Sequence, residues 1–267
     1  MKSFSFVLIF LFLIGCKEEK TFADDIVLDY PKDTKMKTQE FDEDGNEGGE
    51  NLLYIGKIKS NIEVKYYKNI IFEPPPPPPP KEFESKNDYL IRIKELNDSL
   101  SHIKNEYFRN EEIKILETKE NFIDSLSNKN LEIIVKENDT IPLYKENYDT
   151  RALKKYFAVP IFIKNISNKV LRIPTTINSN PLLYIFDSKA QAFFFTKNYS
   201  YWICGTVTDY NSYFELKPNE ILVYAYPYFK SGIKQKAKIR FYNASSKEFE
   251  ISIDENITKN QNSKFYE

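Results

Sequence analysis

Histidine and cysteine are scarce in this 267-residue chain, which has one histidine, His102, and two cysteines, Cys16 and Cys204. Catalytic triads and the common zinc sites are built around histidine or clustered cysteines, so the sequence predicts no metal site, no cofactor and no His-based catalysis. Glycine is also rare, and we find no glycine-rich phosphate loop and no nucleophile elbow. We expect a protein that is not an enzyme; a hydrolase that uses two carboxylates is the catalytic alternative, because such a pair leaves no sequence signature.

A surplus of charge of one sign is missing as well. The chain has 38 basic and 39 acidic residues, so its net charge is close to zero. Without a basic patch to attract phosphates, we expect no nucleic-acid partner. Hydrophobic residues make up 41% of the chain, and this is enough to fill the core of one or two domains.

The N-terminus has the pattern of an export signal. An apolar run at residues 4–13 follows Lys2, is too short to span a bilayer, and ends in Ile-Gly-Cys16. This ending resembles the lipobox of bacterial lipoproteins, which implies a signal peptide at 1–15, a lipid on Cys16 and a membrane as partner. Cys204 would then have no cysteine of its own chain to pair with.

The residues after Cys16 bear on the destination of the chain. Lys17, Glu18 and Glu19 resemble the export signal that sends lipoproteins of Bacteroidetes to the outer leaflet of the outer membrane. The resemblance implies an outer-membrane location, with the cell surface favoured over the periplasmic face. An ordinary charged linker is the alternative interpretation.

Three stretches precede the predicted helical segment. Residues 16–50 are polar, acidic and glycine-rich toward their end, which predicts a flexible lipidated tether. Residues 51–73 predict two or three short strands, and their pairing with later strands stays open. Seven prolines at 74–80 predict a polyproline II rod, a stiff spacer rather than a docking peptide.

An amphipathic helical segment is predicted at 86–128. Its first part carries apolar residues at intervals of three and four, with Ser85 or Asn87 as the cap. This heptad-like pattern allows a coiled-coil partner, while packing on the chain's own sheet is the favoured alternative. A second, less regular helix is expected between Ile113 and Leu126, and His102 is expected on the surface. The apolar positions of the first helix are Leu90, Ile93, Leu96, Leu100, Ile103 and Tyr107.

From residue 131 to 255 short β-branched and aromatic runs recur about every ten residues, and a tail follows at 256–267. This spacing predicts an antiparallel β-sandwich. Residues 192–195 are apolar on both faces and predict a central strand. Residues 237–241 and 249–253 alternate apolar with charged side chains of opposite sign, so they predict a hairpin whose register is helped by Lys–Glu pairs.

Two segments resemble immunoglobulin-like bacterial modules. Residues 157–173 look like the opening strand, Asn-x-Ser turn and strand of these modules, and residues 216–223 look like the Leu-x-Pro-x-Glu turn before a late strand. The resemblance implies a mainly β protein, an immunoglobulin-like antiparallel sandwich that follows a helical segment and a disordered tether. By analogy it also implies a binding or adhesive role.

Candidate surface residues fall in two groups. Aromatic residues of the segment 199–205 and of the predicted strand 222–228 are candidates for ligand binding, with a place in the core as the favoured alternative. Three Asp-Ser/Thr-aliphatic triplets resemble the O-glycosylation signal of exported Bacteroidetes proteins. The aromatic candidates are Tyr199, Tyr201, Trp202, Tyr224, Tyr226 and Tyr228, and the glycosylation candidates are Ser99, Ser125 and Thr140.

Together these features predict a non-catalytic binding or interaction module for a glycan or an envelope protein. A structural subunit of an envelope assembly, docked through the helix or the proline rod, is the alternative. An exposed aromatic patch on the β domain would favour the first function. An apolar stripe left uncovered on residues 90–107 would favour the second.

Overall fold

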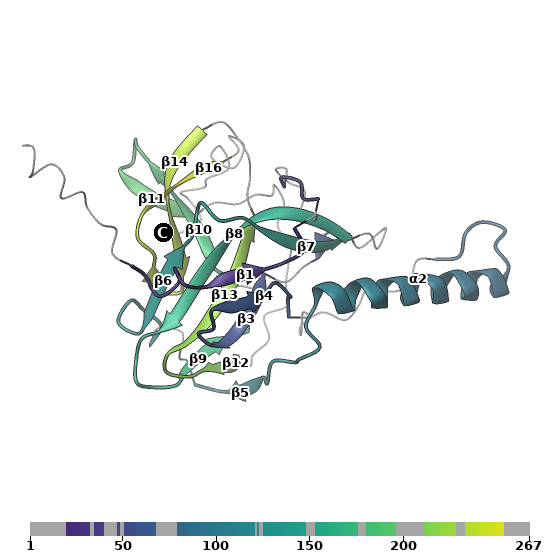
Figure 1. Cartoon of the computed structure of the whole chain (residues 1–267), viewed down its shortest axis with the longest axis horizontal. Coiled ribbons are helices and arrows are strands. Elements are labelled where there is room, and N and C mark those ends of the chain that lie inside the picture. Colours follow the sequence, from purple (N-terminus) through teal and green to yellow (C-terminus); the bar gives the residue numbers. More distant parts are fainter. Residues whose placement is uncertain are drawn as a thin grey trace, which may run out of the picture.

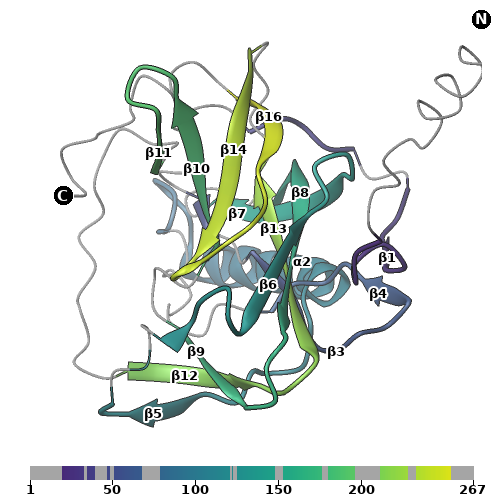
Figure 2. The same ribbon diagram turned by 90° about the vertical axis from the view of Figure 1, so that its left-hand side faces the viewer.

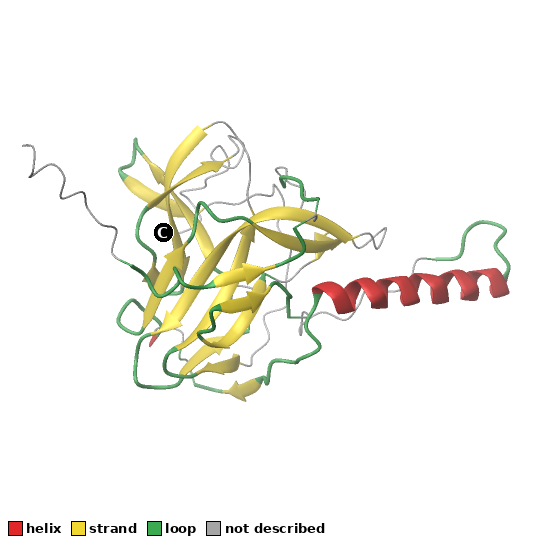
Figure 3. Cartoon of the chain, viewed as in Figure 1, coloured by secondary structure: helices red, strands yellow, loops and turns green. Residues whose placement is uncertain are grey.

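The computed structural model has a body of antiparallel β-sheets from which one long helix projects (Figures 1 and 3). The protein is therefore mainly β, as expected. The structure describes residues 20–32, 35–39, 47–48, 51–67, 79–120, 122, 125–147, 153–175, 180–195, 211–227 and 233–253.

A six-stranded sheet forms the centre of the body. Its order is β2-β7-β8-β13-β3, and β6 pairs with the same edge of β8 as β7 does, further along the strand. β3 pairs with β13, with Ile55 opposite Leu222, so residues 52–57 belong to the sheet. The strands are β2 (Glu47–Gly48), β3 (Leu52–Lys57), β6 (Leu131–Val135), β7 (Ile141–Asn147), β8 (Leu153–Asn165) and β13 (Glu220–Pro227).

The central strands are buried on both faces. In β8, Ile161 and Ile163 belong to one hydrophobic core, while Phe162 between them belongs to a second core on the opposite face. In β13, Leu222 and Val223 divide in the same way. Because both faces need apolar side chains, these strands are continuous hydrophobic runs rather than alternating ones.

Two smaller sheets cover the first face (Figure 2). One has the order β11-β10-β14-β15, with β16 also paired to β14, and the other has the order β5-β12-β9. Buried side chains from all three sheets meet in the first core. The strands are β5 (Leu116–Thr118), β9 (Leu171–Pro174), β10 (Leu182–Asp187), β11 (Ala192–Phe195), β12 (Asn211–Leu216), β14 (Ile233–Phe241), β15 (Ala244–Ser245) and β16 (Phe249–Ile253).

N-terminal residues cover the second face of the central sheet. Residues 16–50 were expected to form a flexible tether, and this expectation is wrong for the described residues 20–32 and 35–39. Ala23 and Ile26 are buried in the second core. β1 (Val27–Asp29) pairs in parallel with β4 (Asn61–Glu63). The segment contributes isolated apolar side chains from turns and a short strand, so it shows no periodicity in the sequence. The segment is ordered because it buries apolar side chains on a face of the central sheet that would otherwise be exposed to water.

The predicted C-terminal hairpin is confirmed. β14 and β16 pair antiparallel with Lys236 opposite Glu250, and Lys238 Nζ lies 3.3 Å from the Glu248 carboxylate. The apolar side chains at 237, 239 and 241 and at 249, 251 and 253 face the first core. Burial on one face and opposite charges on the other both select this register.

Two predicted elements are wrong. The strand 192–195 is not central: β11 pairs with β10 at the end of its sheet, and its side chains are half-buried, with the Phe193 ring 5.2 Å from that of Phe186. No second α-helix forms in described residues 108–120, 122 and 125–128, where β5 and a 3₁₀ turn at Ser125 are found instead. Leu116 of this segment lies in an edge strand, and the spacing of the segment's apolar residues matches the helical period only loosely.

Both segments that suggested immunoglobulin-like modules have the local structure expected. β8 leads through a turn into β9, and β12 leads through the Lys217–Asn219 turn into β13. Asn165 joins the two turns: its buried amide nitrogen donates to the carbonyls of Lys169 (2.8 Å) and Leu216 (2.9 Å). Its side-chain oxygen accepts from the amide and hydroxyl of Ser167. The Asn-x-Ser sequence is thus a satisfied structural connection.

Candidate functional site

Most of the predicted ligand-binding aromatics lie outside the described residues, and the two described ones lie against the core. Tyr224 is 2% exposed and its ring lies 5.8 Å from that of Phe241, so its predicted surface role is wrong. Tyr226 is half-buried against the same core. The predicted site residues outside the described ranges are Cys16, Lys17, Glu18, Glu19, Tyr199, Tyr201, Trp202 and Tyr228, together with Cys204.

The glycosylation candidates are spread over three elements. Ser99 lies within α2 (Lys86–Tyr107). Ser125 and Thr140 are exposed, and the Ser125 hydroxyl donates to the Phe122 carbonyl at 2.6 Å. Glycosylation of these residues stays a prediction.

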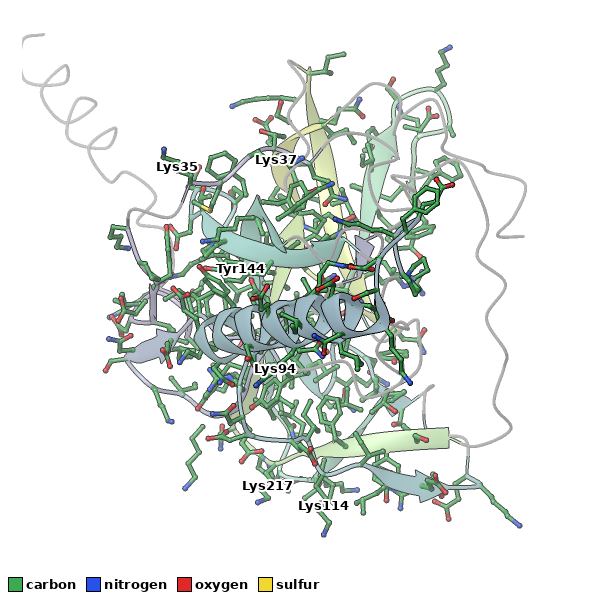
Figure 4. The ribbon with its side chains drawn as sticks, turned by 90° about the vertical axis from the view of Figure 1, so that its right-hand side faces the viewer. Lys35, Lys37, Lys94, Lys114, Tyr144 and Lys217 are labelled. Atoms are coloured by element: carbon green, nitrogen blue, oxygen red, sulfur yellow. The ribbon has the colours of Figure 1, made fainter. Side chains whose placement is uncertain are left out.

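Among the described residues, one feature projects from the body, and we call it, residues 79–107, the arm. It consists of a loop at 79–85 and helix α2, which extends beyond the sheets (Figure 1). Large apolar side chains are exposed at its far end: Phe83 is 97% exposed, Leu90 54% and Ile91 49%. Figure 4 views the molecule from the side of the arm, with Lys94 on α2 and Tyr144 on β7 labelled.

The start of α2 is closed by a side-chain cap. The Ser85 hydroxyl accepts from the Asp88 amide at 3.1 Å and donates to the Asp88 carboxylate at 2.6 Å. This satisfies an amide with no partner inside the helix, and it places a negative charge at the positive end of the helix dipole. Of the two predicted caps, Ser85 is the correct one.

An ion pair folds the loop back onto the helix. Arg92 Nε and Nη2 donate to the two carboxylate oxygens of Glu84 at 2.6 and 2.7 Å. The same carboxylate accepts from the Lys81 amide, and Arg92 Nη2 also donates to the Pro79 carbonyl at 3.3 Å. The bidentate geometry fixes the end of the proline run one and a half turns along α2.

Arg92 and the Lys81 amide lower the pKa of Glu84 from 4.5 to about 2. Because the pKa in the folded protein lies below that of the unfolded chain, the stabilisation by this group is complete above pH 4.5 and is lost as the pH falls toward 2. We expect an NMR titration of the Glu84 carboxyl to have its midpoint near pH 2. Arg92→Gln should return the midpoint toward 4.5.

Arg172→Gln is the control for this titration. It removes a different ion pair, in which Arg172 Nη1 lies 2.6 Å from the Glu120 carboxylate, and should leave the Glu84 midpoint unchanged. A midpoint near pH 4.5 in the unmodified chain would show that the ion pair at the end of the arm does not form.

Aromatic rings hold the C-terminal end of α2 in the second core. The buried Tyr107 ring packs on Tyr144, with centroids 4.1 Å apart, and Tyr66 meets Tyr144 edge-on at 5.9 Å. Lys155 Nζ donates to the Tyr107 hydroxyl at 2.6 Å and lies 4.6 Å from the centre of its ring. Burial raises the pKa of Tyr66 well above its ordinary value.

Arg109 fixes the chain just after the helix. Its guanidinium donates to the carbonyls of Leu53 (2.9 Å), Glu63 (3.0 Å) and Lys65 (3.1 Å). Its amide donates to the Tyr66 carbonyl at 2.7 Å, and the Tyr66 amide donates to the Tyr107 carbonyl at 3.0 Å. One side chain therefore ties the arm to β3 and to the chain after β4. No sequence motif singles out Arg109.

We expect Arg109→Ala to lower the free energy of unfolding by about 2 kcal/mol, because three carbonyls lose a charged donor. Amide exchange in the last turn of α2 should accelerate in the same variant. Arg240→Ala is the matched control, since exposed Arg240 donates to the Tyr242 carbonyl alone in the described structure, and its effect should stay within about 0.5 kcal/mol. Equal losses in urea denaturation of the two variants would contradict an anchoring role for Arg109.

Comparison of the chain with protein-family models, with curated proteins and with solved structures finds no match. Among the described residues, no helix is long and apolar enough to cross a membrane. In the same part of the chain, no group of three His, Cys, Asp or Glu residues is placed to hold a metal ion.

Proposed function

We propose that this chain is a non-catalytic interaction module of the bacterial envelope, in which the arm is the docking element. The observation that carries this proposal is the apolar far end of the arm, where Phe83, Leu90 and Ile91 are exposed, combined with a base that is fixed in the core. Apolar side chains held away from the body are stabilised when a partner covers them.

A protein partner suits the arm better than a glycan does. The exposed residues of the arm include aliphatic Leu90 and Ile91, which bury apolar area against a protein surface. Sugars are bound instead by exposed aromatic faces; the described candidates Tyr224 and Tyr226 lie against the core, and on the arm the exposed ring of Phe83 lies among aliphatic side chains. Among the functions weighed from the sequence, the structural role in an envelope assembly therefore has the stronger support.

The β-sheet body serves as the scaffold in this proposal. We assign it to an immunoglobulin-like sandwich. Support comes from the antiparallel sheets around the first core and from the two turns that Asn165 connects. A lipid on Cys16 would anchor the chain to the outer membrane, and the body would then present the arm to neighbouring envelope proteins.

The proposal is tested by site-specific photo-crosslinking in intact cells. A photoreactive residue at Leu90 should give a discrete adduct whose protein component is identified by mass and then reconstituted with the purified chain. The same residue at exposed Glu95 on the same helix is the control, since Glu95 lies outside the exposed apolar group. Equal, diffuse labelling at both positions would show that the arm docks nothing.

The lipid anchor is checked in the same cells. Cys16→Ser removes the only acylation site that the lipobox resemblance implies, so the chain should move from the membrane fraction to the soluble fraction. Unchanged fractionation would overturn the anchor while leaving the docking role of the arm to the crosslinking result.

A further inference from the structure

Six residues along one side of α2 form a palindrome: their residue types are the same when read from either end of the helix. Its members follow one another at intervals of four, three, four, three and four residues, symmetric about Asp98, and the helix contains all of them. We call these six positions the stripe: Tyr89, Ile93, Leu96, Leu100, Ile103 and Tyr107.

Intervals of alternately three and four residues are those of a heptad seam, which packs against a second helix. If the second helix is an antiparallel copy of α2, Leu96 shares a layer with Leu100 of the second copy, and Ile93 shares one with Ile103. Each layer therefore contains two residues of the same kind, so the stripe is complementary to itself under two-fold symmetry. Tyr107 itself stays outside the interface, because its ring is buried against Tyr144 in the second core of its own chain.

Charge selects the antiparallel direction. The positions that flank the stripe on one side include Arg92 near the start of α2 and Glu106 near its end. In an antiparallel pair Arg92 of each copy faces Glu106 of the other copy, giving two opposite-charge contacts. In a parallel pair Arg92 would instead face the neutral residue Asn97.

The contacts of Arg92 leave room for this pairing. Its Nε and Nη2 bond Glu84 and Pro79, while Nη1 makes no hydrogen bond within the described residues. Glu106 is exposed on the outer surface of the last turn. A guanidinium with five donors can hold both carboxylates at once.

The position of the body also favours an antiparallel pair. The body is attached at the C-terminal end of α2, where Tyr107 is buried. A parallel pair would bring two bodies together at one end. An antiparallel pair places them at opposite ends of a helix of 22 residues, which is about 33 Å long.

We infer that two copies of this chain associate through an antiparallel pair of α2 helices, with the four inner positions of the stripe, Ile93, Leu96, Leu100 and Ile103, as the interface. The inference rests on the proposed function of the arm and names its partner: a second copy of the same chain. Leu90 borders the stripe, and its 54% exposure would decrease in the pair.

The association is measured by sedimentation equilibrium on the purified chain without its lipid, with Cys16→Ser and Cys204→Ala substituted. We expect a reversible dimer whose dissociation constant rises at least about tenfold in Leu96→Ala, because the dimer loses two central leucines. Ile58→Ala is the matched control: it removes an exposed aliphatic side chain that lies outside the arm and should leave the constant unchanged. A monomer at all concentrations, or equal effects of the two variants, would overturn the inference. Circular dichroism verifies that each variant keeps its fold.

Disulfide formation tests the direction of pairing in the same background. A mixture of Leu96→Cys and Leu100→Cys chains should cross-link faster than either variant alone, because these positions share a layer only in an antiparallel pair. Faster cross-linking of each variant with itself would indicate a parallel pair and overturn the inference. Crosslinks from Leu90 to a different protein, together with a monomeric purified chain, would overturn self-association and leave the proposed function intact. A chain that is monomeric and gives no discrete crosslink from Leu90 would overturn both the self-association and the proposed function.

Discussion

Burial of the central sheet on both faces is the constraint on which the rest of the structure depends. The strands β8 and β13 carry apolar side chains toward both cores, as Phe162 and its neighbour Ile163 show. Each face must therefore be covered by another layer. Two smaller sheets cover one face. Residues 20–32, the chain around β4 and the base of the arm cover the other.

The arm depends on this second layer although most of it lies outside the body. Tyr107 enters the second core beside Tyr144, and Arg109 bonds three carbonyls of neighbouring segments, so the helix leaves the sheet from a fixed point. At the opposite end, the Glu84–Arg92 pair closes the loop without help from the body. A helix held at one end and capped at the other keeps its surface available to a partner.

The sequence predicted the elements whose signals are local. Alternation predicted the β14–β16 hairpin, spacing at three and four predicted α2, and Ser85 was among the expected caps. The failures lie where tertiary context decides. Residues 20–32 are ordered because they bury apolar side chains on one face of the central sheet, and this tertiary contact produces no periodic pattern in the sequence. Arg109 is an isolated cation whose role depends on carbonyls brought from β3 and β4, so sequence spacing carries no trace of it.

The central claim is that α2 is an interaction element whose partner is the α2 helix of a second copy. The most direct test is amide hydrogen exchange along α2 as a function of protein concentration. The account predicts that protection of residues 93–103 rises with concentration as arms pair, while protection of β8 and β13 stays constant. Exchange in α2 that is fast and identical at every concentration would contradict it.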